Sequence, residues 1–146
     1  MSDTVLDPLP ESECLARLRE RSVGRIAIVV DGDPVILPVT YRLVEPPSGP
    51  LLALRTRTGN VIEQAPTSVA FEIDSIDATH HAGWSVLVRG ELLHASATSA
   101  QFRELYDPAS WLDDREAWLL IDPWAISGRE LRGADLQWPV RPSEYT

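Results

Sequence analysis

The sequence contains no lysine and a single cysteine, Cys14. One cysteine excludes an internal disulfide, a CxxC redox pair and a zinc site built from several thiolates, and it favours a reducing, intracellular setting. Because every basic side chain is arginine, a bound anion must be held by guanidinium groups, backbone N–H groups or hydroxyls.

Positive charge and long apolar segments are also scarce. The chain has 13 basic and 22 acidic side chains, which give a formal net charge of -9. Nucleic-acid binding normally needs a basic face, so we expect neither DNA nor RNA as a partner. No apolar run approaches the roughly eighteen residues of a membrane helix, and Met1–Pro10 lacks the basic and apolar regions of a secretory signal. We therefore expect a cytoplasmic protein that does not associate with membranes.

The 146 residues fit a single domain, 1–146, in which we expect a core over 11–132 and an irregular tail over 133–146. Apolar residues at helical spacing predict a helix over Glu11–Arg21. Runs of β-branched and alternating apolar residues predict strands, and other patterns predict short peripheral helices. The expected strands are 23–30, 35–41, 51–56, 68–74, 84–95, 117–121 and 127–132, and the expected short helices are 59–65 and 99–106.

Two residues disturb regular pairing within these strands. Pro38 cannot donate a hydrogen bond to a neighbouring strand, so it indicates an edge, a bulge or an interruption, and Gly90 indicates a bulge or a close backbone approach. The strands do not alternate regularly with helices as in a doubly wound fold. The expected fold class is therefore mainly β (α+β), an antiparallel barrel or sandwich of about six strands, and a barrel leaves fewer exposed edges.

The segment from Arg55 to Asn60 is the most suggestive element for ligand binding. It lies where a predicted strand ends and a predicted short helix begins, and N–H groups at a helix N-terminus attract anions. Arg55 and Arg57 can fork onto phosphate oxygens, Thr56 adds a hydroxyl, and Gly59 lets a ligand approach the backbone. On spacing alone, two solvated arginines at a strand end, with Thr58 or Asn60 as the helix cap, remain the simpler interpretation.

Other candidate residues favour structural roles. His80 and His81 are adjacent and therefore project differently, so a solvated loop explains them better than a metal site. Cys14 lies on the apolar side of its helix and is expected in the core. Trp84 either packs in the core or, beside a polar loop, lines a site for a planar ligand. No GxSxG, HExxH, Walker A or GxGxxG pattern occurs, and we expect no metal.

The order of several short motifs resembles the FMN-binding split β-barrel proteins of the pyridoxamine 5'-phosphate oxidase-like superfamily. The resemblance spans Leu15–Arg132, and it implies a six-stranded antiparallel split β-barrel with short peripheral helices. The motifs that carry it are Val23–Ala27, Pro34, Pro38–Tyr41, Arg55–Thr56 with Gly59, Phe71–Asp74, Gly83–Gly90 and Ile126–Arg129.

The resemblance implies a homodimer that holds FMN in two grooves at the subunit interface. One strand segment of this family runs beside the isoalloxazine through backbone contacts, a second element forms the phosphate cradle, and further residues approach the cofactor. The strand segment corresponds here to Pro38, Val39, Thr40 and Tyr41, and the phosphate cradle corresponds to Arg55, Thr56, Gly59 and Asn60. The residues that approach the cofactor correspond to Trp84, Ser85 and Arg129.

Two positions depart from the family pattern. Val61 stands where the family loop usually has a lysine that pairs with the phosphate, and Arg57 is the residue expected to replace that lysine. The segment Gln137–Pro142 does not reproduce the arginine-rich ending of the pyridoxine phosphate oxidases themselves. The resemblance therefore does not imply vitamin B6 synthesis.

The expected function is that of an FMN-dependent oxidoreductase acting on a small-molecule substrate, in which the flavin carries the hydride. No catalytic side chain is identified, although Tyr41 or Ser85 would serve as a proton donor if either faced the ring. One alternative is an F420-dependent reductase on the same fold. The other is a non-catalytic dimer that binds flavin or haem, or that has lost its cofactor.

Overall fold

The structure is a computed structural model that describes residues 5–56, 64–94 and 117–132. One α-helix and seven β-strands lie in these ranges. In chain order they are β1 (Val5–Leu9), α1 (Glu11–Glu20), β2 (Val23–Val30), β3 (Asp33–Val44), β4 (Leu51–Thr56), β5 (Thr67–Asp77), β6 (Ala82–His94) and β7 (Ala117–Arg132).

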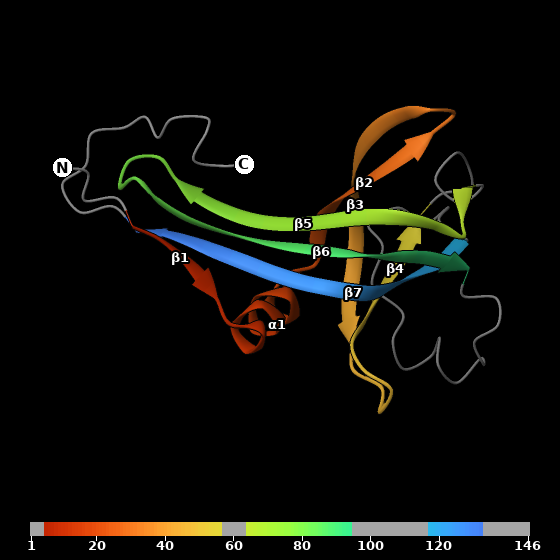
Figure 1. Cartoon of the computed structure of the whole chain (residues 1–146), viewed down its shortest axis with the longest axis horizontal. Helices are drawn as coiled ribbons and strands as arrows, with labels where there is room; N and C mark the ends of the chain where they lie inside the picture. The colour runs from red at the N-terminus through yellow and green to blue at the C-terminus, as the bar shows by residue number, and fades with distance from the viewer. Residues whose placement is uncertain (1–4, 57–63, 95–116, 133–146) are drawn as a thin grey trace.

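The strands form one antiparallel sheet that closes into a ring. The strand order is β1-β7-β4-β3-β2-β5-β6, and an additional pairing of β7 with β6 joins the two sides. The first half of β7 pairs with β4 and its second half pairs with β1, while β6 follows it along most of its length. In Figure 1, β5, β6 and β7 run alongside one another and β2 and β3 cross them steeply. This mainly antiparallel arrangement confirms the expected split β-barrel.

Most predicted elements that fall on described residues are confirmed. The helix ends one residue earlier than predicted, and the strands at 23–30 and 51–56 have the expected bounds. Pro38 pairs with β2 on one side, and β4 pairs with β3 only from Thr40 to Val44, so among the described residues no strand pairs with Pro38 on its other side. The predicted helices at 59–65 and 99–106 and the tail at 133–146 fall wholly or mainly outside the described residues.

Three strand predictions need correction. The predicted strands at 117–121 and 127–132 are one strand, because the ladder with β6 continues across a bulge at Pro123, opposite Gly90. The predicted strand at 68–74 continues to Asp77, so only a short turn separates it from β6. β1 was not predicted at all, since Pro8 is unusual in a strand, and it is tolerated here because β1 lies at the edge of the sheet.

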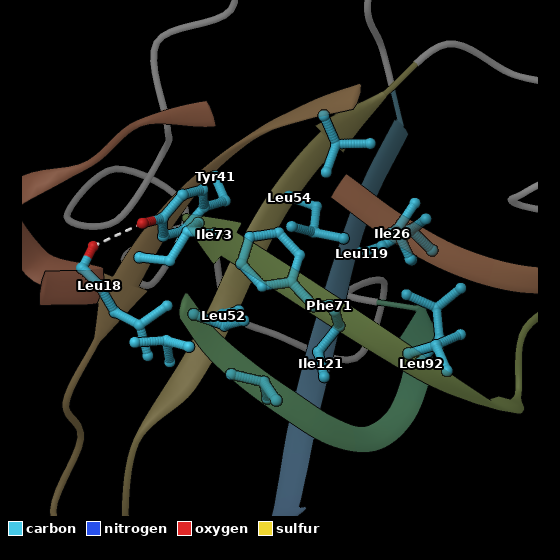
Figure 2. Packing of buried hydrophobic residues seen from close by; sticks show 14 of the residues in the cluster. Leu18, Ile26, Tyr41, Leu52, Leu54, Phe71, Ile73, Leu92, Leu119 and Ile121 are labelled. Atoms are coloured by element: carbon cyan, nitrogen blue, oxygen red, sulfur yellow. Dashed lines mark hydrogen bonds between the residues drawn. The ribbon is translucent and has the colours of Figure 1, made fainter. Parts of the chain in front are cut away.

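The core fills the barrel around Phe71, which is fully buried on β5. Figure 2 shows this ring surrounded by aliphatic side chains from β2, β4, β6 and β7. The ring of Tyr41 meets it edge-on at a centroid distance of 4.8 Å, and the Tyr41 hydroxyl donates a hydrogen bond of 2.7 Å to the carbonyl oxygen of Leu18. α1 is attached through this bond and through its buried residues Cys14 and Leu18. None of the described helical segments is long and apolar enough to span a lipid bilayer.

Candidate functional site

The face of the sheet that points away from the core carries the polar residues of interest. Side chains alternate along each strand, so Ile26 of β2 and Phe71 of β5 are buried while Arg25 and Glu72 point to the opposite side. We call the face of β2, β3, β5 and β6 that is turned away from the core the outer face. The pairing of neighbouring strands, and not a local sequence motif, brings the residues of the outer face together.

Two of the hollows that open on the outer face share a wall. The first has a volume of about 220 Å³, and it is lined by Leu6, Glu72, Asp74, Ile76, Ala82, Gly83, Trp84, Ser85, Arg129 and Leu131. The second has a volume of about 420 Å³, and it is lined by Arg25, Ala27, Ile36, Ala70, Phe71, Glu72, Asp74 and Leu87. Glu72 and Asp74 border both hollows, so the two carboxyl groups lie between them.

An ion cluster of Arg25, Glu72 and Asp74 occupies this shared wall. Nη1 of Arg25 donates to Oε1 of Glu72 at 3.1 Å and to Oδ2 of Asp74 at 3.2 Å. Burial, together with a hydrogen bond to Asp74 and its negative charge, raises the pKa of Glu72 to about 7, although Arg25 opposes the shift. Glu72 therefore exchanges a proton near neutral pH, which a carboxyl group in water does not do.

The segment Pro38–Tyr41 divides between the two faces of β3. Val39 and Tyr41 are buried in the core, whereas Pro38 and Thr40 point to the outer face. The hydroxyl of Tyr41 is bonded to Leu18, and desolvation by burial raises its pKa well above the usual range. The Tyr41 hydroxyl is therefore directed away from the outer face, and only its backbone is available there.

The predicted phosphate cradle is partly described. Thr40 is the direct ladder partner of Arg55, and both side chains are half-buried. Thr40 Oγ1 is buried, and no hydrogen-bond partner for it lies among the described residues. The backbone of Thr56 ends β4 and pairs with Ala117. The remaining predicted cradle residues, Arg57, Gly59 and Asn60, and the departing Val61 lie outside the described residues.

The predicted residues on β6 and β7 also separate by face. Ser85 is the ladder partner of both Asp74 and Arg129, and all three line the first hollow. The ring of Trp84 packs against the core, and the guanidinium carbons of Arg17 and Arg21 lie 4.6 Å and 5.1 Å from its centroid. Trp84 thus borders the first hollow while its ring is engaged by the arginines of α1.

The ladder register brings the two halves of the predicted site onto one face. Thr40 lies two residues from Pro38, Pro38 pairs with Arg25, and Arg25 pairs with Glu72. On the other side of the cluster, Asp74 pairs with Ser85. The cluster of Arg25, Glu72 and Asp74 therefore lies between the Thr40–Arg55 pair and the Ser85–Arg129 pair. The sequence pattern showed a polar face on the strand that contains Glu72 and Asp74, but it did not identify their partner on β2.

Residues outside this face have local roles. His80 donates its backbone N–H to Asp77 Oδ1 at 3.1 Å, and its Nδ1 lies 2.6 Å from Asp77 Oδ2 in the turn between β5 and β6. Within residues 5–56, 64–94 and 117–132, no group of three or more His, Cys, Asp or Glu side chains is arranged to hold a metal ion. Cys14 is buried, and that burial raises the pKa of its thiol, which makes it a poor nucleophile.

Solved structures of other bacterial proteins share this fold. A FAD-binding protein from Mycobacterium smegmatis is 26% identical, with a TM-score of 0.65 over 88% of this chain and 100% of that one. A conserved protein of unknown function from Corynebacterium diphtheriae is 29% identical, with a TM-score of 0.73 over 85% of this chain and 96% of that one. A FAD-binding protein from Mesorhizobium loti, 23% identical, has a TM-score of 0.73 over 88% and 98% of the two chains.

The family assignment rests on the sequence as well as on the fold. No curated protein matches the sequence. The family model described as pyridoxamine 5'-phosphate oxidase matches residues 10–130, which include every strand from β2 to β6 and nearly all of β7. This match confirms the resemblance that the order of the motifs suggested, and the chain belongs to the pyridoxamine 5'-phosphate oxidase family.

Proposed function

We propose that the protein is a flavin-dependent oxidoreductase that binds FMN on the outer face and acts on a small-molecule substrate. The observation that carries the proposal is the Thr40–Arg55 pair. A buried hydroxyl without a partner costs about 1–3 kcal/mol, and an oxygen of a bound ligand would remove this cost by accepting its hydrogen bond. The neighbouring Arg55 adds a guanidinium group that suits a phosphate.

The residues of the chain bind and orient the cofactor in this proposal. Arg55 and Thr40 hold the phosphate end, and the predicted cradle residues Arg57, Gly59 and Asn60, with Thr56, continue that site along the chain. Pro38 presents the backbone of β3 on the outer face, while Ser85 and Arg129 bind a ligand that occupies the first hollow. When bound, the flavin supplies the hydride chemistry, and the protein supplies orientation and electrostatics.

Support for a flavin comes from the family and from one relative. The Mycobacterium smegmatis protein, which is 26% identical to this chain, is named as a FAD-binding protein. That name supports a flavin nucleotide and makes FAD the alternative form of the cofactor. F420 remains the other alternative, but its polyglutamyl tail would be repelled by a chain with a net charge of -9.

The outer face also supports the proposed homodimer. Ile36 and Val29, on neighbouring strands of this face, are 68% and 53% exposed, and Leu87 is exposed beside the second hollow. A second copy of the chain that covered these side chains would remove apolar surface from water and enclose the cofactor. We place the enzyme in the cytoplasm, because its single cysteine suits a reducing compartment.

The phosphate assignment is tested by the Arg55→Ala variant. We expect FMN affinity to fall at least tenfold, because a charge-assisted hydrogen bond worth roughly 1.5–3 kcal/mol is lost. The matched control is Arg19→Ala, which removes an arginine of α1 that pairs with Glu45 away from the outer face. FMN titration by flavin fluorescence measures both affinities. Equal affinity of Arg55→Ala and wild type would place the phosphate elsewhere.

The assignment as an enzyme needs a separate experiment. Flavin-loaded protein should be reduced by NADH or NADPH and reoxidised by oxygen or an organic acceptor, and absorbance near the flavin band follows both steps. Bound flavin that neither nicotinamide cofactor reduces would make the protein a flavin carrier instead.

A further inference from the structure

The cluster of Arg25, Glu72 and Asp74 lies on the outer face with its two carboxyl groups partly shielded from water. Glu72 and Asp74 are two residues apart on β5, so both point to the same side, and Arg25 is the ladder partner of Glu72 on β2. One nitrogen of Arg25 binds both carboxyl groups, at 3.1 Å and 3.2 Å. The side chains of Glu72 and Asp74 are 34% and 27% exposed, whereas that of Arg25 is 55% exposed.

The surroundings offer Glu72 few other charges. On β6 its ladder partner is the apolar Leu87, and Arg89 lies two residues further along the same face of β6. On β3 the residues next to Arg25 and Ala27 in the register are Pro38 and Ile36. β7 contributes Arg129 at the far side of the first hollow. The charge of the cluster therefore changes by one unit when Glu72 gains or loses its proton.

The carboxyl group of Glu72 borders both of the hollows described above. Glu72 lines the first hollow with Ser85 and Arg129, and it lines the second hollow with Ile36 and Leu87. A ligand in either hollow displaces water from a carboxyl group that is already half-buried, and displacement of water favours the neutral form of that group. A ligand with a negative charge favours the neutral form further, because it is repelled by ionised Glu72.

We infer that an anionic ligand binds to the outer face together with one proton, and that Glu72 holds this proton. The inference rests on the proposed function in taking flavin nucleotide as the ligand, and it adds how pH controls the occupancy of the site. Binding and protonation are reciprocal, so a proton that promotes FMN binding is itself held more tightly once FMN is bound. The proton comes from the solvent, and no covalent bond to the ligand forms.

The sign and size of the effect follow from the ionisation of free Glu72. Because its pKa is about 7, free protein is half protonated at pH 7 and largely ionised at pH 8. If binding raises this pKa well above 8, FMN binding takes up about half a proton at pH 7 and about nine-tenths at pH 8. FMN affinity then falls by up to about tenfold for each pH unit above 7.

Isothermal titration calorimetry of the intact protein with FMN tests this inference. Titrations at pH 7 and pH 8, each in two buffers with different ionisation enthalpies, give the number of protons taken up. The test variant is Glu72→Gln, which keeps the shape and the hydrogen-bonding capacity of a neutral carboxyl group. The matched control is Glu91→Gln, which removes one exposed charge from β6. The ionisation of the FMN phosphate is common to all three proteins, so differences between them report on Glu72.

In wild type and Glu91→Gln we expect proton uptake on binding and a loss of FMN affinity above pH 7. In Glu72→Gln we expect only the proton uptake and the pH dependence that the FMN phosphate itself contributes. Equal proton uptake in Glu72→Gln and wild type, with FMN bound by both, refutes this inference and leaves the proposed function intact. Failure of wild type to bind FMN or FAD at any pH refutes the proposed function and this inference with it. A ¹³C NMR titration of the free protein that places Glu72 near the usual pKa of a glutamate, about 4.3, also refutes the inference.

Discussion

The contact between Gly24 and Phe71 provides a direct test of the packing that positions the outer face. A Cβ atom added at Gly24 would lie 2.2 Å and 2.6 Å from two carbons of the Phe71 ring, closer than any real contact. Phe71 is fully buried and in contact with Tyr41, so the ring cannot swing into solvent to make room. β2 and β5 would therefore have to separate at the position where Arg25 pairs with Glu72.

The cost of Gly24→Ala follows from this overlap. Inserting a methyl group into a packed core costs about 1–3 kcal/mol, and the lower entropy of the unfolded alanine chain returns about 0.4–1 kcal/mol. We expect a loss of about 2 kcal/mol in the free energy of unfolding, measured by urea denaturation. The same substitution in a Phe71→Leu background should cost little, since the ring is gone, and the difference between the two backgrounds isolates the contact. A Gly24→Ala protein as stable as wild type would refute the packing described here.

Two further predictions concern stability. Tyr41→Phe removes a buried hydrogen bond of 2.7 Å to the carbonyl of Leu18, which keeps only the longer bond of 3.4 Å from the backbone N–H of Arg21, so we expect a loss of about 1 kcal/mol in urea denaturation. The absorption spectrum of any bound flavin should stay unchanged in this variant, because the hydroxyl faces the core, and a changed spectrum would contradict that orientation. The hydrogen bonds from His80 lower the pKa of Asp77. Ionised Asp77 therefore stabilises the folded protein above the usual pKa of an aspartate, and this contribution to the free energy of unfolding is lost as pH falls through the lowered pKa. Asp77→Asn should therefore slightly lower the melting temperature at pH 6 and have a smaller effect in acid, and an equal effect at both values would contradict the assignment.

Local pattern was sufficient to predict most of the fold. The helix Glu11–Glu20 has apolar residues at helical spacing, and the strands at 23–30 and 51–56 are apolar runs with clear turn residues on either side. β1 and the middle of β7 were not predicted because each contains a proline, and a proline is tolerated at an edge or a bulge that only the assembled sheet creates.

The site was less accessible to prediction because it depends on register. The motifs placed Thr40, Arg55, Ser85 and Arg129 in the site one by one, but nothing in the sequence states that Thr40 faces Arg55 or that Ser85 faces both Asp74 and Arg129. Glu72 was visible only as a polar residue in an alternating strand.

Orientation within a strand was likewise uncertain. Tyr41 and Thr40 are adjacent, and the sequence alone did not say which of them points to the core. The hydrogen bond to Leu18 decides this, because it fixes the Tyr41 ring against α1 and so turns Thr40 outward. Alternation then assigns Pro38 and Thr40 to the outer face and Val39 to the core, so half of the predicted segment contributes side chains to the site.

The most direct test of a flavin-binding outer face is the absorption spectrum of freshly purified protein, followed by mass analysis of any chromophore released on denaturation. The account predicts a flavin spectrum and released FMN, or uptake of added FMN if the protein is purified without it. A protein that carries no chromophore and takes up neither FMN nor FAD would contradict the central claim, and release of F420 would replace the flavin with a deazaflavin.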